Sequence, residues 1–222
     1  MLKAIRAEFS PLRYDLFFWI QLVIITVFSF YFSPNPLMKP EQIFFESICD
    51  VSLFNLLYIV FPILSASIGV IERTPSQMVL AGCSRFEIVV SKFVRYFAVY
   101  CIASLIYPLV NCLYYCIPWF ATLTGAYAVY MLRCIVLRIL MGLAFASIPL
   151  IFVFRFRNLY IPLIAAVVYS IPTLILSVRI TRAIMSRTAF PFAFVIAAVI
   201  SVIVIAFSIA VSYLCFRRAD LK

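Results

Sequence analysis

This 222-residue chain has only four glycines and no histidine, and these shortages argue against a nucleotide site and a metal site. None of the four glycines begins a phosphate-binding loop that ends in Gly-Lys-Ser/Thr, so the chain has no nucleotide site of that kind. Without histidine, and with seven cysteines that form no Cys-x-x-Cys pair, a metal site is not expected. We therefore predict no catalytic, cofactor-binding or metal-binding residues, and we do not expect an enzyme.

Long polar stretches are also scarce, because 67% of the residues are hydrophobic and the mean hydropathy is +1.17. A soluble domain of this length cannot bury so much apolar surface, but a bilayer can, since a helical span needs roughly 20 apolar residues. The chain is predicted to be an all-α polytopic membrane protein, a single transmembrane domain over residues 1–222 with six transmembrane helices and no soluble catalytic domain. The apolar runs that predict these helices are 16–32, 51–70, 97–117, 130–154, 159–176 and 191–216.

Acidic residues are few: 8 stand against 18 lysines and arginines, which gives a net charge of +10. With six spans, most of the basic residues fall on the side that holds both termini, and few fall on the other side. The positive-inside rule then predicts a multi-pass protein of the cell membrane with both termini in the cytoplasm. Nucleic acid is not expected as a partner, because no basic soluble face remains to follow a phosphate backbone; the bilayer is the expected partner of the basic excess.

The start of the chain, residues 1–9, reads as a short amphipathic helix in the cytoplasmic interface. Leu2, Ile5 and Phe9 share one face of this helix, and the basic residues lie off that face. Ser10 is expected to cap the helix that forms the first span.

Prolines interrupt two later spans, at Pro149 in the fourth and at Pro162 and Pro172 in the fifth. Proline removes a backbone donor, so these helices are expected to kink or break. Broken helices can line a path across the membrane, but they also occur without that role, and the sequence leaves both interpretations open. The external loop at 177–190 is basic, and whether it re-enters the membrane is open.

The loop at 71–92, between the second and third spans, carries the most local information outside the membrane. Thr74 and Gln77 have the spacing of a capping box, which begins a helix. Gly82 can adopt the left-handed conformation that ends this helix. Ser84 and Glu87 form a second capping box, where the helix that leads into the third span begins.

A short, rigid cytoplasmic helix has two interpretations. It can be an interfacial helix that only connects two spans, or it can be a docking element for a cytoplasmic partner. In the second case Met78 and Leu80 are expected to be the apolar anchors in the contact. The charged residues expected around these anchors are Glu72, Arg73, Arg85 and Glu87.

The same loop resembles the coupling-helix loop of the type-two family of ATP-binding-cassette exporter permeases. The resemblance rests on Glu72, Thr74, the run 80–85, Ile88 and Lys92, together with Ala7-Glu8-Phe9 and the tail 216–222. One departure is Arg73-Thr74-Pro75, which stands where members of the family often carry a Gly-Thr pair. The coupling residues that the resemblance implies are Glu72, Thr74, Gln77, Met78, Leu80, Gly82, Ser84, Arg85 and Glu87.

The resemblance implies a permease subunit of an ATP-driven exporter in a bacterial plasma membrane. A second permease subunit, identical or different, would complete the pathway, and separate cytoplasmic ATPase subunits would bind ATP and Mg²⁺. The implied cargo is hydrophobic or amphipathic: an antimicrobial peptide, a drug or a lipid. Two rivals stay open, an ion-coupled secondary transporter or channel and a non-transporting membrane scaffold. No Asp, Glu or His lies well inside a span, which argues against the first of these rivals.

Two arginines, Arg133 and Arg138, lie within the fourth span. Charge inside a bilayer is costly, so Arg133 is expected to extend toward the headgroups, and Arg138, which is deeper, to be paired or water-exposed within the protein. Asp50 or Glu46 is a candidate partner for Arg138, and whether Arg138 contacts cargo is open. The polar residues expected to hold the spans together are Gln21, Asn55 and Asn111.

Overall fold

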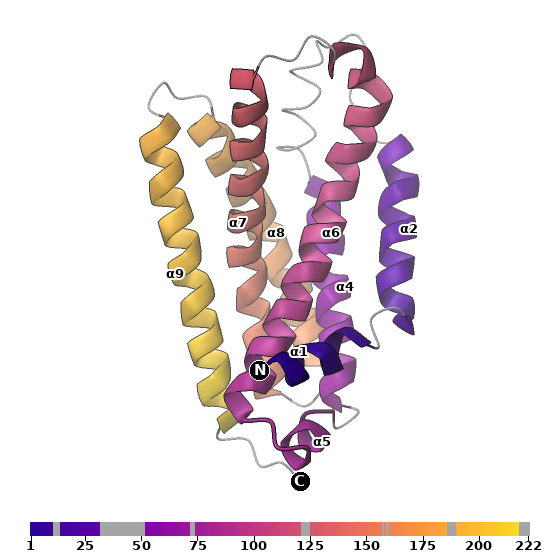
Figure 1. Ribbon diagram of the computed structural model, residues 1–222, viewed down its shortest axis with the longest axis vertical. Helices are drawn as coiled ribbons and strands as arrows, with labels where there is room; N and C mark the ends of the chain where they lie inside the picture. Colours follow the sequence, from indigo (N-terminus) through magenta and orange to yellow (C-terminus); the bar gives the residue numbers. More distant parts are fainter. Residues whose placement is uncertain are drawn as a thin grey trace.

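The computed structural model describes residues 1–10, 14–31, 52–71, 74–120, 125–156, 158, 160–185 and 190–217. Within these residues the regular secondary structure is helical, with no strand. Long helices lie side by side in a bundle, while two short helices, α1 and α5, lie at one end of it (Figure 1). The helices are α1 (Leu2–Phe9), α2 (Leu16–Tyr31), α4 (Ser52–Ile71), α5 (Thr74–Leu80), α6 (Arg85–Phe120), α7 (Gly125–Arg155), α8 (Tyr160–Met185) and α9 (Phe190–Arg217).

Three stretches among the described residues are long and apolar enough to cross a membrane. They lie in α6, α7 and α9, over Arg85–Asn111, Leu132–Arg155 and Phe192–Arg217, and their mean hydropathies are 1.7, 2.3 and 3.0. Shorter apolar helical stretches occupy Leu16–Tyr31 and Tyr160–Ile171. The prediction of an all-helical membrane protein is confirmed at this level.

The described part of each apolar run lies in a helix, but one connection differs from expectation. α8 continues to Met185, so most of the loop expected at 177–190 is helical, and that prediction was wrong for residues 177–185. α6 is a single helix of 36 residues that begins after Ser84, where the second capping box predicts it, and continues through the apolar run 97–117. The capping box at Ser84 and the apolar run 97–117 therefore belong to one continuous helix.

The expected helix breaks at proline are absent from the described helices. α7 passes through Pro149, and α8 passes through Pro162 and Pro172. Pro162 stands in the first turn of α8, where the backbone N–H has no partner inside the helix in any case. At the other two positions one missing hydrogen bond does not end the helix, because neighbouring helices support it.

α1 has the predicted bounds but turns a different side toward the protein. Its buried residues are Ala4 and Glu8, while Leu2 is exposed and the rest of the expected apolar face is only half-buried. Ser10 does not cap the next helix; it has helical backbone angles at the end of α1, and its N–H donates to the Arg6 carbonyl. That expectation was wrong because the acidic residue Asp15 caps α2 instead, as described below.

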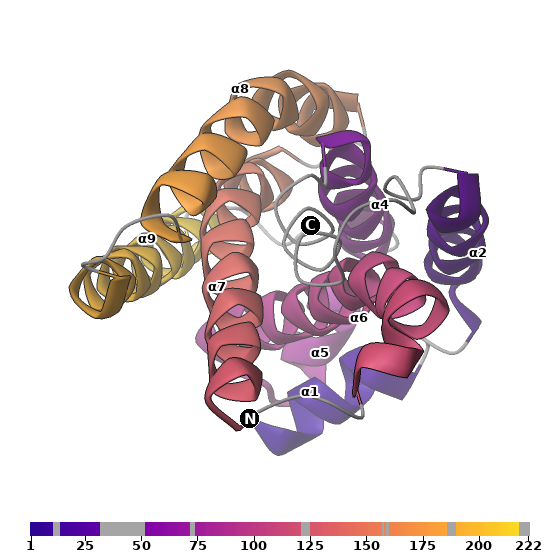
Figure 2. The same cartoon turned by 90° about the horizontal axis from the view of Figure 1, so that it is seen from above.

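The core of the bundle lies where α4, α6 and α7 meet (Figures 1 and 2). Tyr58 of α4 and Tyr100 of α6 are both buried, with ring centroids 6.0 Å apart and edges turned to faces. Gly142 of α7 lies against the hydroxyl of Tyr100, so close that a Cβ atom there would be 1.8 Å from it. The absence of a side chain at Gly142 thus lets α6 and α7 pack closely at this level.

α9 lies at the edge of the bundle and packs mainly against α7 (Figure 2). The two helices are joined by a hydrogen bond from the Ser147 hydroxyl to the Ser208 hydroxyl, 3.0 Å long. Most of the large apolar side chains of α9, among them Ile203 and Phe207, point away from the protein. A helix with this pattern suits lipid on its outer face.

Candidate functional site

The helix α5 ends in two backbone hydrogen bonds that fix the chain direction after it. The N–H of Gly82 donates to the carbonyl of Val79, and the N–H of Cys83 donates to the carbonyl of Met78, both at 2.9 Å. Gly82 has φ +84°, the left-handed conformation that this C-terminal motif requires. The sequence predicted this helix end, and the backbone at Gly82 confirms it.

The second predicted capping box is present at the start of α6. The N–H of Glu87 donates to the Ser84 hydroxyl at 3.2 Å, and the N–H of Ser84 donates to the Glu87 carboxylate at 2.9 Å. The amino group of Met1 pairs with the same carboxylate, so the start of α1 lies at this box. The first predicted box involves the Thr74 side chain, which lies outside the described residues, as do Glu72 and Arg73.

The two expected anchors of α5 lie on different sides of it. Met78 is only 5% exposed and packs into the hydrophobic core of its own chain, whereas Leu80 is 88% exposed. The prediction that Met78 faces a partner was wrong for this reason. The side of the helix that meets the bundle is decided by tertiary packing, and residues two apart on a helix do not share a face. Among the described side chains of α5, those of residues 77–80, Gln77 and Leu80 are exposed.

The corner between α5 and α6 is also joined to the last helix. The Arg85 guanidinium donates to the main-chain carbonyl of Arg217 at the end of α9. The Phe86 ring meets the edge of the Tyr213 ring, with centroids 5.7 Å apart. A displacement of this corner would therefore move α9 as well as α6.

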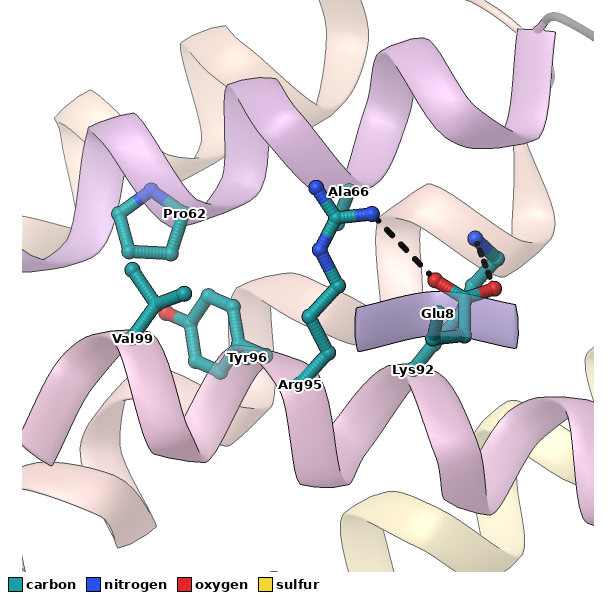
Figure 3. A pocket seen from close by; sticks show the side chains of 7 residues that line it. All are labelled: Glu8, Pro62, Ala66, Lys92, Arg95, Tyr96 and Val99. Atoms are coloured by element: carbon teal, nitrogen blue, oxygen red, sulfur yellow. Dashed lines mark hydrogen bonds and ion pairs between the residues drawn. The ribbon is translucent and has the colours of Figure 1, made fainter. Parts of the chain in front are cut away.

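Four buried or nearly buried charges lie beside this corner, and we call them the charge cluster: Glu8, Asp15, Lys92 and Arg95. Glu8 Oε1 lies 2.9 Å from Lys92 Nζ, and Glu8 Oε2 lies 3.5 Å from Arg95 Nη1 (Figure 3). Arg95 Nη2 also lies 2.7 Å from Asp15 Oδ2. The side chains of Glu8 and Lys92 are each 2% exposed. Two carboxylates thus balance two cations, as burial of charge requires.

Asp15 has two roles, because each of its oxygens has a different partner. Oδ1 accepts hydrogen bonds from the N–H groups of Phe17 and Phe18, at 3.0 and 3.4 Å, and so caps α2. Oδ2 pairs with Arg95. The charge cluster therefore connects three elements: α1 through Glu8, the start of α2 through Asp15, and α6 through its two basic residues.

A small cavity adjoins the charge cluster between α4 and α6 (Figure 3). Its size suits about one water molecule. Tyr96 lines it and is 2% exposed, and its hydroxyl has no hydrogen-bond partner among the described residues. The residues that line the cavity are Glu8, Pro62, Ala66, Lys92, Arg95, Tyr96 and Val99.

Sequence reasoning did not find the charge cluster. In the sequence, Glu8 and Lys92 stand out only as parts of the resemblance, and no motif marks Asp15. One signal was available: Lys92 and Arg95 are three residues apart, which places two cations on one face of a helix that enters an apolar run. Such a pair needs acidic partners, and the N-terminal segment holds two acids that are otherwise unexplained.

The two arginines of α7 differ in exposure. Arg133 is exposed, whereas Arg138 is only 7% exposed. Arg138 is close enough to Tyr58 and Tyr100 to interact with both electrostatically. The candidate partners Asp50 and Glu46 lie outside the described residues.

Two of the three polar span residues have described side chains, and both are buried. Gln21 Nε2 donates to the Leu57 carbonyl at 3.3 Å, which ties α2 to α4 and agrees with the expected role in helix association. Asn111 is 1% exposed in α6. Asn55 has no described side chain. Within the described residues, no group of three or more His, Cys, Asp or Glu side chains could hold a metal ion.

No family model, curated protein or solved structure matches this chain. Three features stand out among the described residues: the corner at α5 and α6, the charge cluster beside it, and the buried arginine of α7.

Proposed function

We propose that this protein is the membrane-spanning permease subunit of an ATP-driven exporter of the ATP-binding-cassette type, with α5 as its coupling helix. The observation that carries the proposal is the geometry of the corner. A short helix is held at its C-terminal end by a Gly82 turn and is followed at once by a capped helix. Its outer side presents Leu80 to the surroundings. Pre-organisation of this kind lowers the entropy cost of binding a partner.

The proposal includes six spans, formed by α2, α4, α6, α7, α8 and α9, with both termini in the cytoplasm. The support is the distribution of basic residues, which gather at the end of the bundle that carries α1 and α5. By the positive-inside rule this end faces the cytoplasm. The described basic residues at this end are Lys3, Arg6, Arg85, Lys92, Arg95, Arg155 and Arg217.

The proposed mechanism begins at a cytoplasmic ATPase, because this chain has no phosphate-binding loop. Closure of the ATPase subunits on ATP would push α5. Since α5 leads directly into the 36-residue α6, the push would tilt α6, and α9 would follow through its contacts with Arg85 and Phe86. A second permease subunit would form the other half of the pathway. The cargo class that fits an apolar bundle is hydrophobic or amphipathic: a peptide, a drug or a lipid.

The test is a substitution at Leu80. Leu80→Asp places a charge in the apolar centre of the proposed contact, and an unpaired charge buried on binding costs on the order of several kcal/mol. We expect Leu80→Asp to lose most of the co-purifying ATPase and the cargo-stimulated ATP hydrolysis, at normal abundance in the membrane. Leu80→Met, which keeps an apolar side chain of similar size, is the matched control and should retain both. Retention of the ATPase by Leu80→Asp would refute the proposed role of α5.

A further inference from the structure

The charge cluster lies on the first turns of α6, the helix that directly follows α5. Lys92 is eight residues beyond Ser84, the cap of α6, which corresponds to about 12 Å along the helix axis. Glu8 brings α1 against this part of α6, and the opposite end of α1 reaches the Glu87 capping box. α1 therefore lies along the first turns of α6, from the charge cluster back to the corner with α5.

The order of α1 depends on this contact. α1 has eight residues, and an isolated helix of that length is not stable in water. Its buried side chains are Ala4 and Glu8, so an apolar methyl group and one ion-paired carboxylate face the bundle. Loss of the pairing at Glu8 would leave a charge buried without compensation, which is strongly destabilising for the docked state.

The neighbouring cavity gives the charge cluster a way to open. Tyr96 lines the same small space as the ion-paired Glu8, Lys92 and Arg95, with its hydroxyl turned toward Pro62 and Val99, so water that enters this space can hydrate the ion-paired side chains (Figure 3). Water stabilises hydrated charges and weakens their mutual attraction, whereas charges in a water-free site are stabilised mainly by each other. The structure shows the closed, ion-paired arrangement, and hydration of these charges would favour an open one.

We propose that the charge cluster is a latch: when closed it holds α1 on α6 and fixes α5 against the bundle, and when open it releases α5. The latch is a property of this chain alone. Its test needs no ATPase, so it can fail while the proposed transport function stands, and the reverse also holds.

The experiment is hydrogen–deuterium exchange of the full-length protein purified in detergent. Three segments are followed: 2–10 for α1, 77–83 for α5 and its end, and 140–150 of α7 as the internal reference. The single variants are Glu8→Gln and Lys92→Met. In both we expect exchange at least roughly tenfold faster in 2–10 and in 77–83, with 140–150 unchanged.

Two further variants make the test specific. Lys3→Met removes an exposed charge from the same helix and should leave all three segments like the parent protein. The double variant Glu8→Met with Lys92→Met replaces the ion pair by apolar groups, which is often neutral or stabilising, so protection should return to within about threefold of the parent. If a single variant does not accumulate, the test rests on the double variant alone. The latch then requires that the double variant folds and that its exchange is close to that of the parent.

Three results would overturn the latch. Parent-like exchange in both single variants would show that the pairing does not hold α1. Fast exchange in 2–10 with unchanged exchange in 77–83 would show that α1 docks without fixing α5. A double variant as fast as either single variant, or one that fails to fold, would show that the charges act by something other than pairing with each other.

Discussion

Buried charge occurs in two regions of the described molecule, and the surroundings of the charge differ. At the end that carries α1 and α5, the charge cluster sets two carboxylates against two cations, and three separate elements supply them. In the core, Arg138 lies among tyrosines of α4 and α6, beside a glycine that lets the helices pack closely. Ion pairs between separate elements can break and re-form as those elements move. A closely packed core, in contrast, allows a single arrangement of its side chains. We therefore expect substitutions in the core to change stability, and substitutions at the α5–α6 corner to change the position of α5.

The largest effect is expected from Gly142→Ala in the core. The added methyl carbon would lie 1.8 Å from the Tyr100 hydroxyl oxygen and 2.7 Å from its Cζ atom. Because Tyr100 is 1% exposed and packs against Tyr58, its ring can move aside only by displacing buried neighbours. We expect a loss of about 3 kcal/mol in the free energy of unfolding, measured as lower thermal stability in detergent.

The control for this prediction is the double variant Gly142→Ala with Tyr100→Phe. Removal of the hydroxyl relieves the shortest contact, so part of the stability should return. If Gly142→Ala protein is as stable as the parent, α6 and α7 do not pack as closely at Gly142 as described. The core would then be able to rearrange, as we expect of the elements joined by the charge cluster.

The next effect is expected from Arg138→Leu, with Arg133→Leu as its matched control on the same helix. Arg138 is buried within electrostatic reach of Tyr58 and Tyr100. We expect Arg138→Leu, which removes this cation from polar surroundings, to lower the free energy of unfolding by about 2 kcal/mol. Arg133 is exposed, so its replacement should stay within about 0.5 kcal/mol. Thermal stability and transport should both fall more for Arg138→Leu. Equal behaviour of the two variants would place Arg138 at the lipid surface rather than in the core.

The smallest effect is expected at the corner, from Gly82→Ala. No atom lies within 4 Å of the position of the added carbon, so the cost arises only from φ +84°, at about 1 kcal/mol. Gly82→Asn should cost less, because asparagine tolerates this conformation better than alanine does. Both should leave the bundle folded while exchange of residues 77–83 becomes faster. A larger loss in Gly82→Asn than in Gly82→Ala would mean that a tight neighbour, not the backbone, requires glycine.

The sequence predicted the features that depend on local chemistry. Apolar runs marked the long helices to within a few residues, except where α6 and α8 extend beyond theirs. The capping box at Ser84 and the left-handed Gly82 were found because their partners lie within a few residues along the chain. Each of these signals is complete in a short window, so no tertiary information was needed.

The features that failed depend on contacts between distant residues. Arg95 meets Asp15 across 80 positions and Glu8 across 87, and no periodicity reports such a pairing. Met78 was placed on the wrong side of α5 because hydrophobicity alone does not say whether an apolar side chain meets its own core or a partner. The same contacts explain why Asp15, rather than Ser10, caps α2: the cap is also held by Arg95.

The most direct test of the central claim is photo-crosslinking from position 80 in native membranes, with Phe207 of α9 as the comparison position. Both side chains are exposed, one on α5 and one on the outer face of α9. We predict that a photoreactive residue at position 80 captures an ATPase subunit, recognised by peptides with the phosphate-binding sequence that this chain lacks, and that position 207 captures lipid. Capture of only lipid or of the same chain from position 80, in cells that hold the intact complex, would contradict the account.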